Sequence, residues 1–518
     1  MKLFALLLTL AAARGLPAAD KGDTYTLPKD FLLGGGISTY QAEGAWDAEG
    51  KGLSVLDHGY HVENRTPNGD VAADAYNRYA EDIDIASEIG FNVFRFSISW
   101  PRIFPNGRNS SINDAGVQHY HKVLDKLIEK RMQPVVTLFH FDHPQALEDE
   151  FGGWLGDEMP DVFAAYADFA FKTYGSKVKH WLTVNEASWY CAHLGEALLY
   201  PKTYTTTETQ NKCLKNSIIA HAKAHEIYDS KYRHSQQGMV GFGAGPQFFR
   251  AANLSSAEDI ALAQLTNEAK GIGLTVDAVV FGDFPEAAKK DRNISFTDEE
   301  KQLIKGRVDF LGINVYGGTS VNASEGGPDE GSGMHPGGFG DKDSQWVMRE
   351  MPKWIKDRYE RDGRELPIFI TENGVHGDGE DGAGTSPLDD WEERAVYCSA
   401  FLRELVAGVN QDGTRVIGYT LWSFIDTFEF RAFSNWGVVH VDFASGSLNR
   451  TKKASWTFFQ RVMETRAVPL VEKGSAPFQP SGPSSTTTPS STTPSGSAAY
   501  RSSLVLAAAA VMLQMWSQ

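Results

Sequence analysis

Eight short runs of β-branched and aromatic residues recur along the chain, and their spacing constrains the fold more than any other feature. They lie at residues 31–36, 91–98, 134–140, 180–185, 238–245, 308–314, 367–372 and 415–422. Apolar runs of this length, bounded by turn residues, are typical of strands that are buried on both faces. The intervals between them are long enough for the crossover helices that a parallel sheet requires.

The intervals themselves carry helical periodicity. In residues 76–90, YNRYAEDIDIASEIG, the side chains of Tyr79, Ile83 and Ala86 fall on one face of a helix. Strands that alternate with such helices predict a parallel sheet covered by helices. Eight repeats favour closure into a (β/α)8 barrel over an open, doubly wound sheet. We therefore expect residues 20–473 to form a single α/β domain, a TIM barrel.

The composition and charge of the chain narrow its partners. With 42% hydrophobic and 12% aromatic residues, the sequence has the make-up of a folded globular protein. Its formal net charge of −17 repels phosphate backbones and anionic lipid headgroups. We expect no nucleic-acid partner, and contact with a membrane only through a lipid anchor at the C-terminal end.

Residues 1–19 are predicted to be a secretory signal peptide. The segment MKLFALLLTLAAARG places one lysine before an apolar run and small residues after it. A buried N-terminal helix is the alternative, but the segment shows no amphipathic pattern. A secreted chain meets the N-glycosylation machinery, and six Asn-x-Ser/Thr acceptor sites are present, at Asn64, Asn109, Asn253, Asn293, Asn322 and Asn449.

The C-terminal end changes composition twice. Residues 474–497 are rich in Ser, Thr and Pro, which predicts an extended linker or stalk; a disordered tail is the alternative. Residues 498–518 carry a short polar spacer and an apolar run that ends almost at the terminus, which is the layout of a GPI-anchor signal. We expect the protein to be secreted, or held at the extracellular surface by a GPI anchor.

The three cysteines predict one disulfide and no metal site. Cys191 and Cys213 flank a polar segment and are predicted to pair in an oxidising compartment, whereas Cys398 lies in an amphipathic run and is predicted to be a buried thiol. Neither CxxC nor HExxH spacing occurs, and the histidines form no ligand pattern. We therefore expect neither a catalytic metal nor a cofactor.

Polar residues that end the predicted strands are the candidates for chemistry, because a barrel places its reactive groups at the C-terminal ends of its strands. Two of them are glutamates, Glu186 after the fourth run and Glu372 at the end of the seventh. A pair of carboxyl groups that converges on one sugar ring is what hydrolysis of a glycoside requires. The whole set is Gln41, Arg95, His140, Asn185, Glu186, Asn314, Tyr316, Glu372, Trp422 and Glu429.

The two carboxyl groups need different environments, because one must donate a proton to the leaving oxygen while the other attacks as an anion. Arg95 and Tyr316 are suited to hold a carboxylate in its ionised form. The sequence leaves open which of the two glutamates they contact. For a single glutamate, a solvated charge at a strand end is the alternative interpretation, and only the combination of residues argues for catalysis.

Seven motifs together resemble glycoside hydrolase family 1, the β-glucosidase family, over roughly residues 24–468. They are FLLGGGISTYQAEGAW at 31–46, FRFSISWPRIFP at 94–105, LFHFDHP at 138–144, TVNEA at 183–187, FLGINVY at 310–316, ITENG at 370–374 and LWSFIDTFEF at 421–430. The resemblance implies a (β/α)8 barrel and a mechanism that retains anomeric configuration through a covalent glycosyl-enzyme. It agrees with the strand count.

The resemblance also implies roles for individual residues. Glu186 matches the acid/base of the family and Glu372 its nucleophile, while Asn185 matches the residue that binds the sugar 2-hydroxyl. Arg95 and Tyr316 match the partners of the nucleophile. The remaining candidates for substrate binding are Gln41, His140, Asn314, Trp422, Glu429 and Phe430, which supply polar groups and an aromatic platform for a pyranose.

Four positions depart from the family pattern. Ala187 follows the acid/base glutamate where the family usually has Pro, and Phe141 and His143 stand where it commonly has Trp and Leu. Phe430 stands where the family often has a Trp whose indole N–H reaches a sugar hydroxyl; Phe keeps the ring but lacks this donor. These differences concern the walls of the pocket and leave the carboxyl pair intact.

Three other functions remain as alternatives to β-glucoside hydrolysis. The same site serves a thioglucosidase, although plant myrosinases have Gln at the acid/base position where this chain has Glu186, or a transglycosidase. A non-catalytic glycan-binding receptor is the alternative from another class; loss of one carboxylate would mark it, and neither is lost. The Gly-rich segment 322–346 is predicted to line the aglycone side of the pocket, with a passive surface loop as the alternative.

Overall fold

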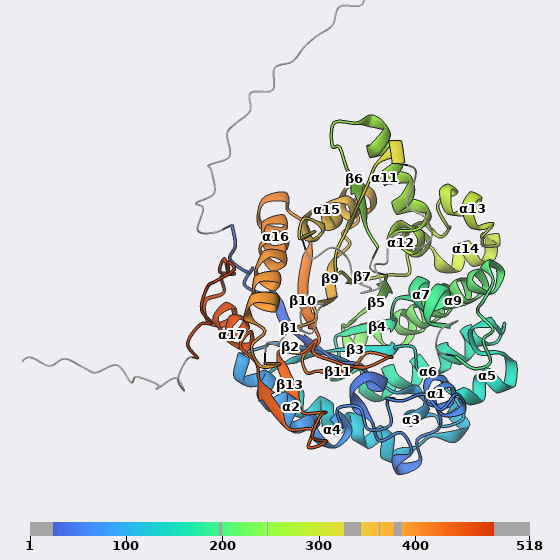
Figure 1. Ribbon diagram of the computed structural model, residues 1–518. Coiled ribbons are helices and arrows are strands. Elements are labelled where there is room, and N and C mark those ends of the chain that lie inside the picture. The colour runs from blue at the N-terminus through green and yellow to red at the C-terminus, as the bar shows by residue number, and fades with distance from the viewer. Residues whose placement is uncertain are drawn as a thin grey trace, which may run out of the picture. The chain divides into compact units, whose positions relative to one another are not determined.

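The eight predicted strands all form, and they close into one parallel barrel (Figure 1). The computed structural model describes residues 24–480, except 196–198, 246, 326–342, 362 and 378–385. The predicted signal peptide, almost all of the predicted linker and anchor signal, and most of the Gly-rich segment at 322–346 therefore lie outside the described residues and stay predictions. Within the described part, no helix is long and apolar enough to cross a bilayer.

The barrel strands coincide with the eight apolar runs. They are β1 (Leu32–Gly36), β2 (Val93–Ser97), β3 (Gln133–Phe139), β4 (His180–Val184), β5 (Met239–Ala244), β7 (Phe310–Asn314), β9 (Ile368–Asn373) and β10 (Val416–Trp422). Their order around the ring is β1, β10, β9, β7, β5, β4, β3 and β2, and every neighbouring pair is parallel. Closure follows because β1 pairs with both β2 and β10.

Helices surround the barrel strands, as Figure 1 shows. The longer ones are α1 (Val55–Val62), α2 (Ala75–Ile89), α4 (Asp114–Glu129), α6 (Met159–Tyr174), α9 (Thr207–Lys231), α11 (Ala257–Ala269), α12 (Gly273–Phe281), α15 (Val347–Tyr359), α16 (Val396–Asp412) and α17 (Trp456–Thr465). In α2, Ile83 and Ala86 are buried and Tyr79 packs against the core, which confirms the predicted apolar face. The helices thereby cover the outer face of a sheet whose strands are apolar on both sides.

Shorter elements decorate this frame. Three two-stranded sheets pair β6 (Phe249–Ala251) with β8 (Thr319–Val321), β11 (Thr427–Phe428) with β12 (Phe433–Ser434), and β13 (Val439–Val441) with β14 (Arg450–Lys452). Short helical segments include η1 (Thr39–Glu43), α5 (Gln145–Phe151), α7 (Ala187–Trp189), η5 (Tyr190–Leu194) and η7 (Trp391–Ala395). Several of them follow the C-terminal ends of barrel strands, where the candidate site residues lie.

One end of the barrel interior is filled by apolar side chains. Leu32, Val93, Val135, Leu182, Phe310 and Phe369 form a separate buried cluster. Most of them stand at or near the first residue of their strand, so the cluster closes the amino-terminal end. The polar residues that end the same strands therefore gather at the opposite end, as barrel enzymes require.

The cysteines are arranged as the sequence indicates. Cys191 and Cys213 form a disulfide with a Cα–Cα separation of 5.6 Å, which joins η5 to α9. Cys398 is a buried free thiol. The disulfide lies five positions after Glu186 and thus fastens the segment that follows this glutamate.

Candidate active site

The strand ends bring the two glutamates and their neighbours together at the carboxyl end of the barrel. Arg95 lies on β2, Glu372 on β9 and Asn314 at the end of β7, while Asn185 and Glu186 directly follow β4. Each of these side chains is at most 6% exposed. In the ring, β4 and β9 are separated by β5 and β7, so the two glutamates approach from different walls.

Glu372 is surrounded by groups that stabilise an anion. Arg95 Nη1 donates to Oε1 at 2.5 Å, and the Tyr316 hydroxyl donates to Oε2 at 2.6 Å. Charge-assisted hydrogen bonds of this kind are about twice as strong as bonds between neutral groups. Burial and the Glu372 carboxylate raise the pKa of Tyr316 well above its usual value, so Tyr316 remains a donor. The question left open by the sequence is thus decided: Arg95 and Tyr316 both contact Glu372.

Glu186 has a less polar environment. Within the part of the chain that the structure describes, one hydrogen bond reaches it, from Asn314 Nδ2 to Oε1 at 2.6 Å. Burial, followed by the nearby Glu372 charge, raises the pKa of Glu186 from 4.5 to about 8. A carboxyl group that is desolvated and faces a like charge favours its protonated form. Glu186 is therefore suited to act as an acid at neutral pH.

Two asparagines connect the surroundings of the two glutamates. Arg95 Nη2 donates to Asn185 Oδ1 at 2.8 Å, and Asn314 Nδ2 donates to the same oxygen at 3.2 Å. Asn185 also contacts His140 Nε2 at 3.4 Å. Burial, with the Arg95 charge, lowers the pKa of His140 well below its usual value, so this ring is neutral. One continuous network therefore fixes the acid, the anion and the residues between them.

The residues expected to bind the sugar form one wall beside the pair. Trp422 Nε1 donates to Glu429 Oε1 at 3.2 Å, and the Trp422 ring stacks on His140 at 5.6 Å. Burial raises the pKa of Glu429 to about 7, while hydrogen bonds from Thr427, Trp422 and Gln41 lower it. A carboxyl group, a neutral imidazole and an indole face are suited to the hydroxyl edges and C–H faces of a pyranose.

Two of the four departures from the family pattern, Phe141 and Phe430, belong to one aromatic surface. Phe430 stacks parallel to Tyr40 at 6.4 Å and meets Phe141 at 6.1 Å, while Phe141 stacks on Tyr190 at 5.7 Å. Phe430 adopts a positive φ of 58°, and its carbonyl oxygen accepts a hydrogen bond from Tyr60. The surface is apolar at the point where the family often supplies an indole donor.

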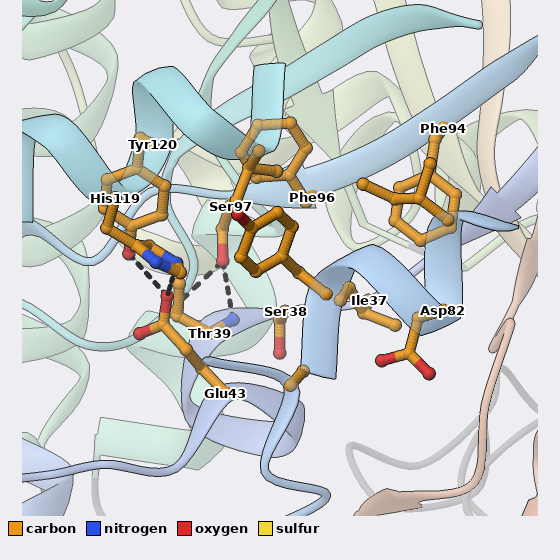
Figure 2. A pocket seen from close by; sticks show the side chains of 14 residues that line it. Ile37, Ser38, Thr39, Glu43, Asp82, Phe94, Phe96, Ser97, His119 and Tyr120 are labelled. Carbon is orange, nitrogen blue, oxygen red and sulfur yellow. Dashed lines mark hydrogen bonds and ion pairs between the residues drawn. The ribbon is translucent and has the colours of Figure 1, made fainter. Parts of the chain in front are cut away.

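A small hollow is lined by β2, α2, α4 and the segment 37–43 that carries Gln41. Figure 2 shows Thr39, Ser97, Glu43 and His119 close together on one side of it, and Ile37 and Phe94 with the Asp82 carboxylate on the other. Thr39 N donates to Ser97 Oγ at 2.8 Å, and Thr39 Oγ1 donates to Asp142 Oδ2 at 2.6 Å. Neither glutamate of the pair lines this hollow, so it supports the site from behind and is not the site itself.

Three residues of the site have no counterpart among the sequence candidates. Thr371 Oγ1 donates to Asn314 Oδ1 at 2.7 Å, and Thr427 Oγ1 donates to Glu429 Oε1 at 2.8 Å. Thr371 lies one position before Glu372, and Thr427 lies two positions before Glu429, both inside the motifs quoted above. This closeness to a candidate glutamate is the sequence signal that could have identified them. Trp436 packs edge-on against Tyr316 at 5.7 Å and lies outside every motif, so no sequence signal points to it.

Metal chemistry finds no ligand set in the described part of the chain. Residues 24–480, with the gaps given above, contain no cluster of three or more His, Cys, Asp or Glu side chains placed to hold an ion. The groups around Glu186 and Glu372 are instead amides, a guanidinium and hydroxyls. They donate hydrogen bonds to the two carboxyl groups and so orient them.

This arrangement defines a class: a barrel enzyme with a buried carboxyl pair of unequal ionisation, as retaining hydrolysis of glycosides requires. Residues 23–468 match the family described as "Glycosyl hydrolase family 1". The chain belongs to this family, and it is a retaining glycoside hydrolase.

Similar sequences and similar solved structures agree with the family and with the class of enzyme. Myrosinase 1 of Brevicoryne brassicae is 32% identical over 85% of this chain and 99% of its own length. β-Glucosidase 22 of rice, Oryza sativa subsp. japonica, is 34% identical over 88% of this chain and 89% of its own length. The structure of an aphid myrosinase superposes with a TM-score of 0.75 at 31% identity, covering 85% of this chain and 99% of the other. A rice β-glucosidase mutant in covalent complex with glucose superposes with a TM-score of 0.75 at 32% identity, covering 84% and 99%.

Proposed function

We propose that this enzyme is a β-glucosidase in which Glu372 is the nucleophile and Glu186 the acid/base. The observation that carries the assignment is the unequal surroundings of the two carboxyl groups. Glu372 faces the Arg95 guanidinium and the Tyr316 hydroxyl, whereas among the described side chains the donor to Glu186 is the neutral amide of Asn314. Stabilised charge suits a nucleophile, and a raised pKa suits an acid.

The first step forms a covalent intermediate. A Glu372 carboxylate oxygen attacks the anomeric carbon, the glycosidic bond breaks, and its electron pair goes to the leaving oxygen. Glu186 transfers its proton to that oxygen, so the aglycone departs as a neutral alcohol. The hydrogen bonds from Arg95 and Tyr316 weaken as the carboxylate of Glu372 loses its negative charge. The strength of these bonds therefore affects the rate at which Glu372 attacks.

The second step releases the sugar. Glu186, now ionised, accepts a proton from water, and the water oxygen attacks the anomeric carbon as the bond to Glu372 breaks. Glu372 regains its charge and its bonds from Arg95 and Tyr316, and Glu186 regains its proton. Two inversions give net retention of configuration.

Azide rescue of two alanine variants tests these roles. Activity is measured on aryl β-glucosides, first with the wild type and then with Glu186→Ala and Glu372→Ala. We expect azide to restore Glu186→Ala by attacking the glycosyl-enzyme, which gives the β-glycosyl azide, and to give the α-azide with Glu372→Ala. The same anomer from both variants contradicts the assignment, and no turnover of any glycoside by the wild type overturns the function.

A thioglucosidase is the second candidate, because a similar sequence and a similar solved structure are both named as myrosinases. The presence of Glu186 favours O-glycosides, since a thiolate leaving group needs less protonation. A transferase is also represented among the relatives, by a cyanidin 3-O-glucoside glucosyltransferase of Delphinium grandiflorum, 33% identical. Rates on a thioglucoside and its O-glucoside with the same aglycone, with and without added alcohol acceptors, distinguish the three.

The proposed place of action is outside the cell, either free or GPI-anchored. The apolar N-terminus, the Ser/Thr/Pro-rich stretch and the apolar C-terminal run support this proposal. Five of the six acceptor asparagines are exposed, and Asn322 is half-buried. We expect a loss of mass when an N-glycan-removing enzyme acts on the protein expressed in a eukaryotic secretory host. Release from cells by a phosphatidylinositol-specific phospholipase tests the anchor.

A further inference from the structure

Glu186 stands on a backbone that needs outside support. It adopts φ 41° and ψ 53°, a left-handed conformation, at the point where β4 ends and α7 begins. Residues other than glycine hold such a conformation only where the surrounding structure imposes it. The segment after Glu186, which comprises α7 and η5, is therefore the place to look for that support.

Tyr190 lies at the centre of this segment and is fixed on several sides. Its backbone N–H donates to the carbonyl oxygen of Glu186 at 2.9 Å, so its position is coupled directly to that of the glutamate. Its ring stacks on Phe141 at 5.7 Å, with only 7° between the planes. The next residue, Cys191, is bonded to Cys213 of α9. The Tyr190 hydroxyl contacts a histidine.

That histidine is His143, and both of its ring nitrogens have partners. Nδ1 lies 3.4 Å from the Tyr190 hydroxyl, and Nε2 lies 3.0 Å from Glu148 Oε2. His143 is fully buried, and the side chain of Glu148, on α5, is 5% exposed. With Nε2–H donating to the carboxylate, Nδ1 is left as the acceptor for the Tyr190 O–H.

The space for this pair is provided by Gly153. A Cβ atom at Gly153 would lie 2.0 Å from Glu148 Oε2 and 2.7 Å from His143 Nε2, and this glycine has a positive φ of 55°. Tyr204 also packs edge-on against Tyr190, at 6.0 Å. His143 and Glu148 are thus enclosed by their neighbours. Tyr190 has little freedom to move while its hydroxyl contacts His143.

We propose that His143, oriented by Glu148, is a positioning residue that acts through Tyr190 to hold the acid/base Glu186 in place. His143 touches neither glutamate of the catalytic pair in the described contacts; its influence passes through the Tyr190 hydroxyl and backbone. The proposal rests on the role of Glu186 as proton donor, and it deepens that role by naming what fixes the donor.

The test compares two substrates that differ in their need for an acid. 2,4-Dinitrophenyl β-glucoside has a leaving group that departs without protonation, whereas phenyl β-glucoside depends on the proton from Glu186. The ratio of kcat/KM for the first to that for the second is independent of how much enzyme is correctly folded. We expect this ratio to rise about tenfold in His143→Leu and in Tyr190→Phe, part of the 10²–10⁴-fold that a general acid contributes.

Three further variants make the result specific. His143→Gln keeps a donor for Glu148 and an acceptor for Tyr190, and we expect it to return most of the wild-type ratio. The double variant His143→Leu/Tyr190→Phe should show the ratio of either single variant, because both remove the same contact. His225→Leu removes the contact of another buried histidine with a carboxylate, the partly buried Asp309 at 3.1 Å, just before β7, and should leave the ratio unchanged.

Several results overturn the positioning role. They are a ratio within twofold of wild type in both single variants, additive effects in the double variant, or an equal rise in His225→Leu. Failure of the wild type to release dinitrophenol overturns the proposed function and the positioning role together. Unchanged ratios in an active wild type and its variants overturn the positioning role alone.

Discussion

Arg95 and Glu372 form a buried ion pair across the mouth of the barrel, with Nη1 and Oε1 2.5 Å apart. The strands that carry them, β2 and β9, are not neighbours, because β1 and β10 lie between them in the ring. The same guanidinium also donates to Asn185 beyond β4 and to Thr137 on β3. This one side chain therefore links β2, β3 and the end of β4 to the nucleophile on β9.

Removal of the second donor to Glu372 should slow catalysis without unfolding the protein. Tyr316→Phe deletes the 2.6 Å hydrogen bond to Oε2 and keeps the ring that packs against Trp436. A hydrogen bond to a charged group contributes about 1.5–3 kcal/mol, so kcat/KM should fall about 10- to 100-fold. Tyr174→Phe is the control, because its hydroxyl donates to the Val117 carbonyl oxygen, away from the pair. Equal losses in both variants contradict the prediction.

The pH dependence of activity should follow Glu186. Its pKa is raised to about 8, chiefly by burial, and it must be protonated for the first step. Activity on a substrate with a poor leaving group should therefore fall as pH rises through about 8. The alkaline limb of kcat/KM should flatten for the dinitrophenyl substrate and disappear in Glu186→Ala. If the alkaline limb of kcat/KM is identical for both substrates in the wild type, the limb reports the titration of a group other than Glu186.

Stability should depend on the same group. A carboxyl group whose pKa rises on folding binds its proton more tightly in the native state, so its contribution is fully present below pH 4.5. That contribution is lost as pH rises towards about 8. The side chain in Glu186→Gln is neutral at every pH. The free energy of unfolding of this variant should therefore increase relative to that of the wild type as pH rises between these values. Urea denaturation at pH 5 and pH 8 measures this, and a constant difference refutes it.

Phe430 should determine whether the pocket donates a hydrogen bond to one of the sugar hydroxyls. Phe430→Trp supplies the indole donor that the present ring lacks, in a surface formed with Tyr40 and Phe141. We expect kcat/KM for a glucoside to rise about tenfold relative to its deoxy analogue that lacks the contacted hydroxyl. Competition between glucosides deoxygenated at positions 3, 4 and 6 measures it. Phe141→Leu, which changes the same surface without adding a donor, should not alter the preference.

The disulfide should stabilise the fold measurably. It closes a loop with a sequence separation of 22 residues, for which the entropy of the unfolded chain predicts about 3 kcal/mol. Cys191→Ser together with Cys213→Ser should lower the free energy of unfolding by that amount and lower Tm. Cys398→Ala changes the buried free thiol and leaves the loop closed. A double variant as stable as the wild type would show that the crosslink adds nothing.

The sequence by itself predicted the barrel and most residues of the site, although Thr371, Thr427 and Trp436 were not among its candidates. The apolar runs at 180–185 and 367–372 are local patterns; Glu186 directly follows the first and Glu372 ends the second, and a barrel presents such positions at its carboxyl end. Strand identity and strand-end position depend on short-range periodicity, which a single sequence displays. The placement of Glu186 and Glu372 at one mouth followed from these two facts.

Only the tertiary structure decided which groups meet. Arg95 pairs with Glu372 and Asn314 with Glu186 because the ring closes in one order and brings distant strands within hydrogen-bond distance. The contacts of His143 with Tyr190 and Glu148 likewise join a loop after β3 to the segment after β4. Sequence spacing fixes neither contact, because hydrogen bonds between side chains depend on packing in three dimensions. Local sequence patterns thus identify most residues that form the site. The fold determines which glutamate is the acid and which is the anion, because it decides the neighbours of each.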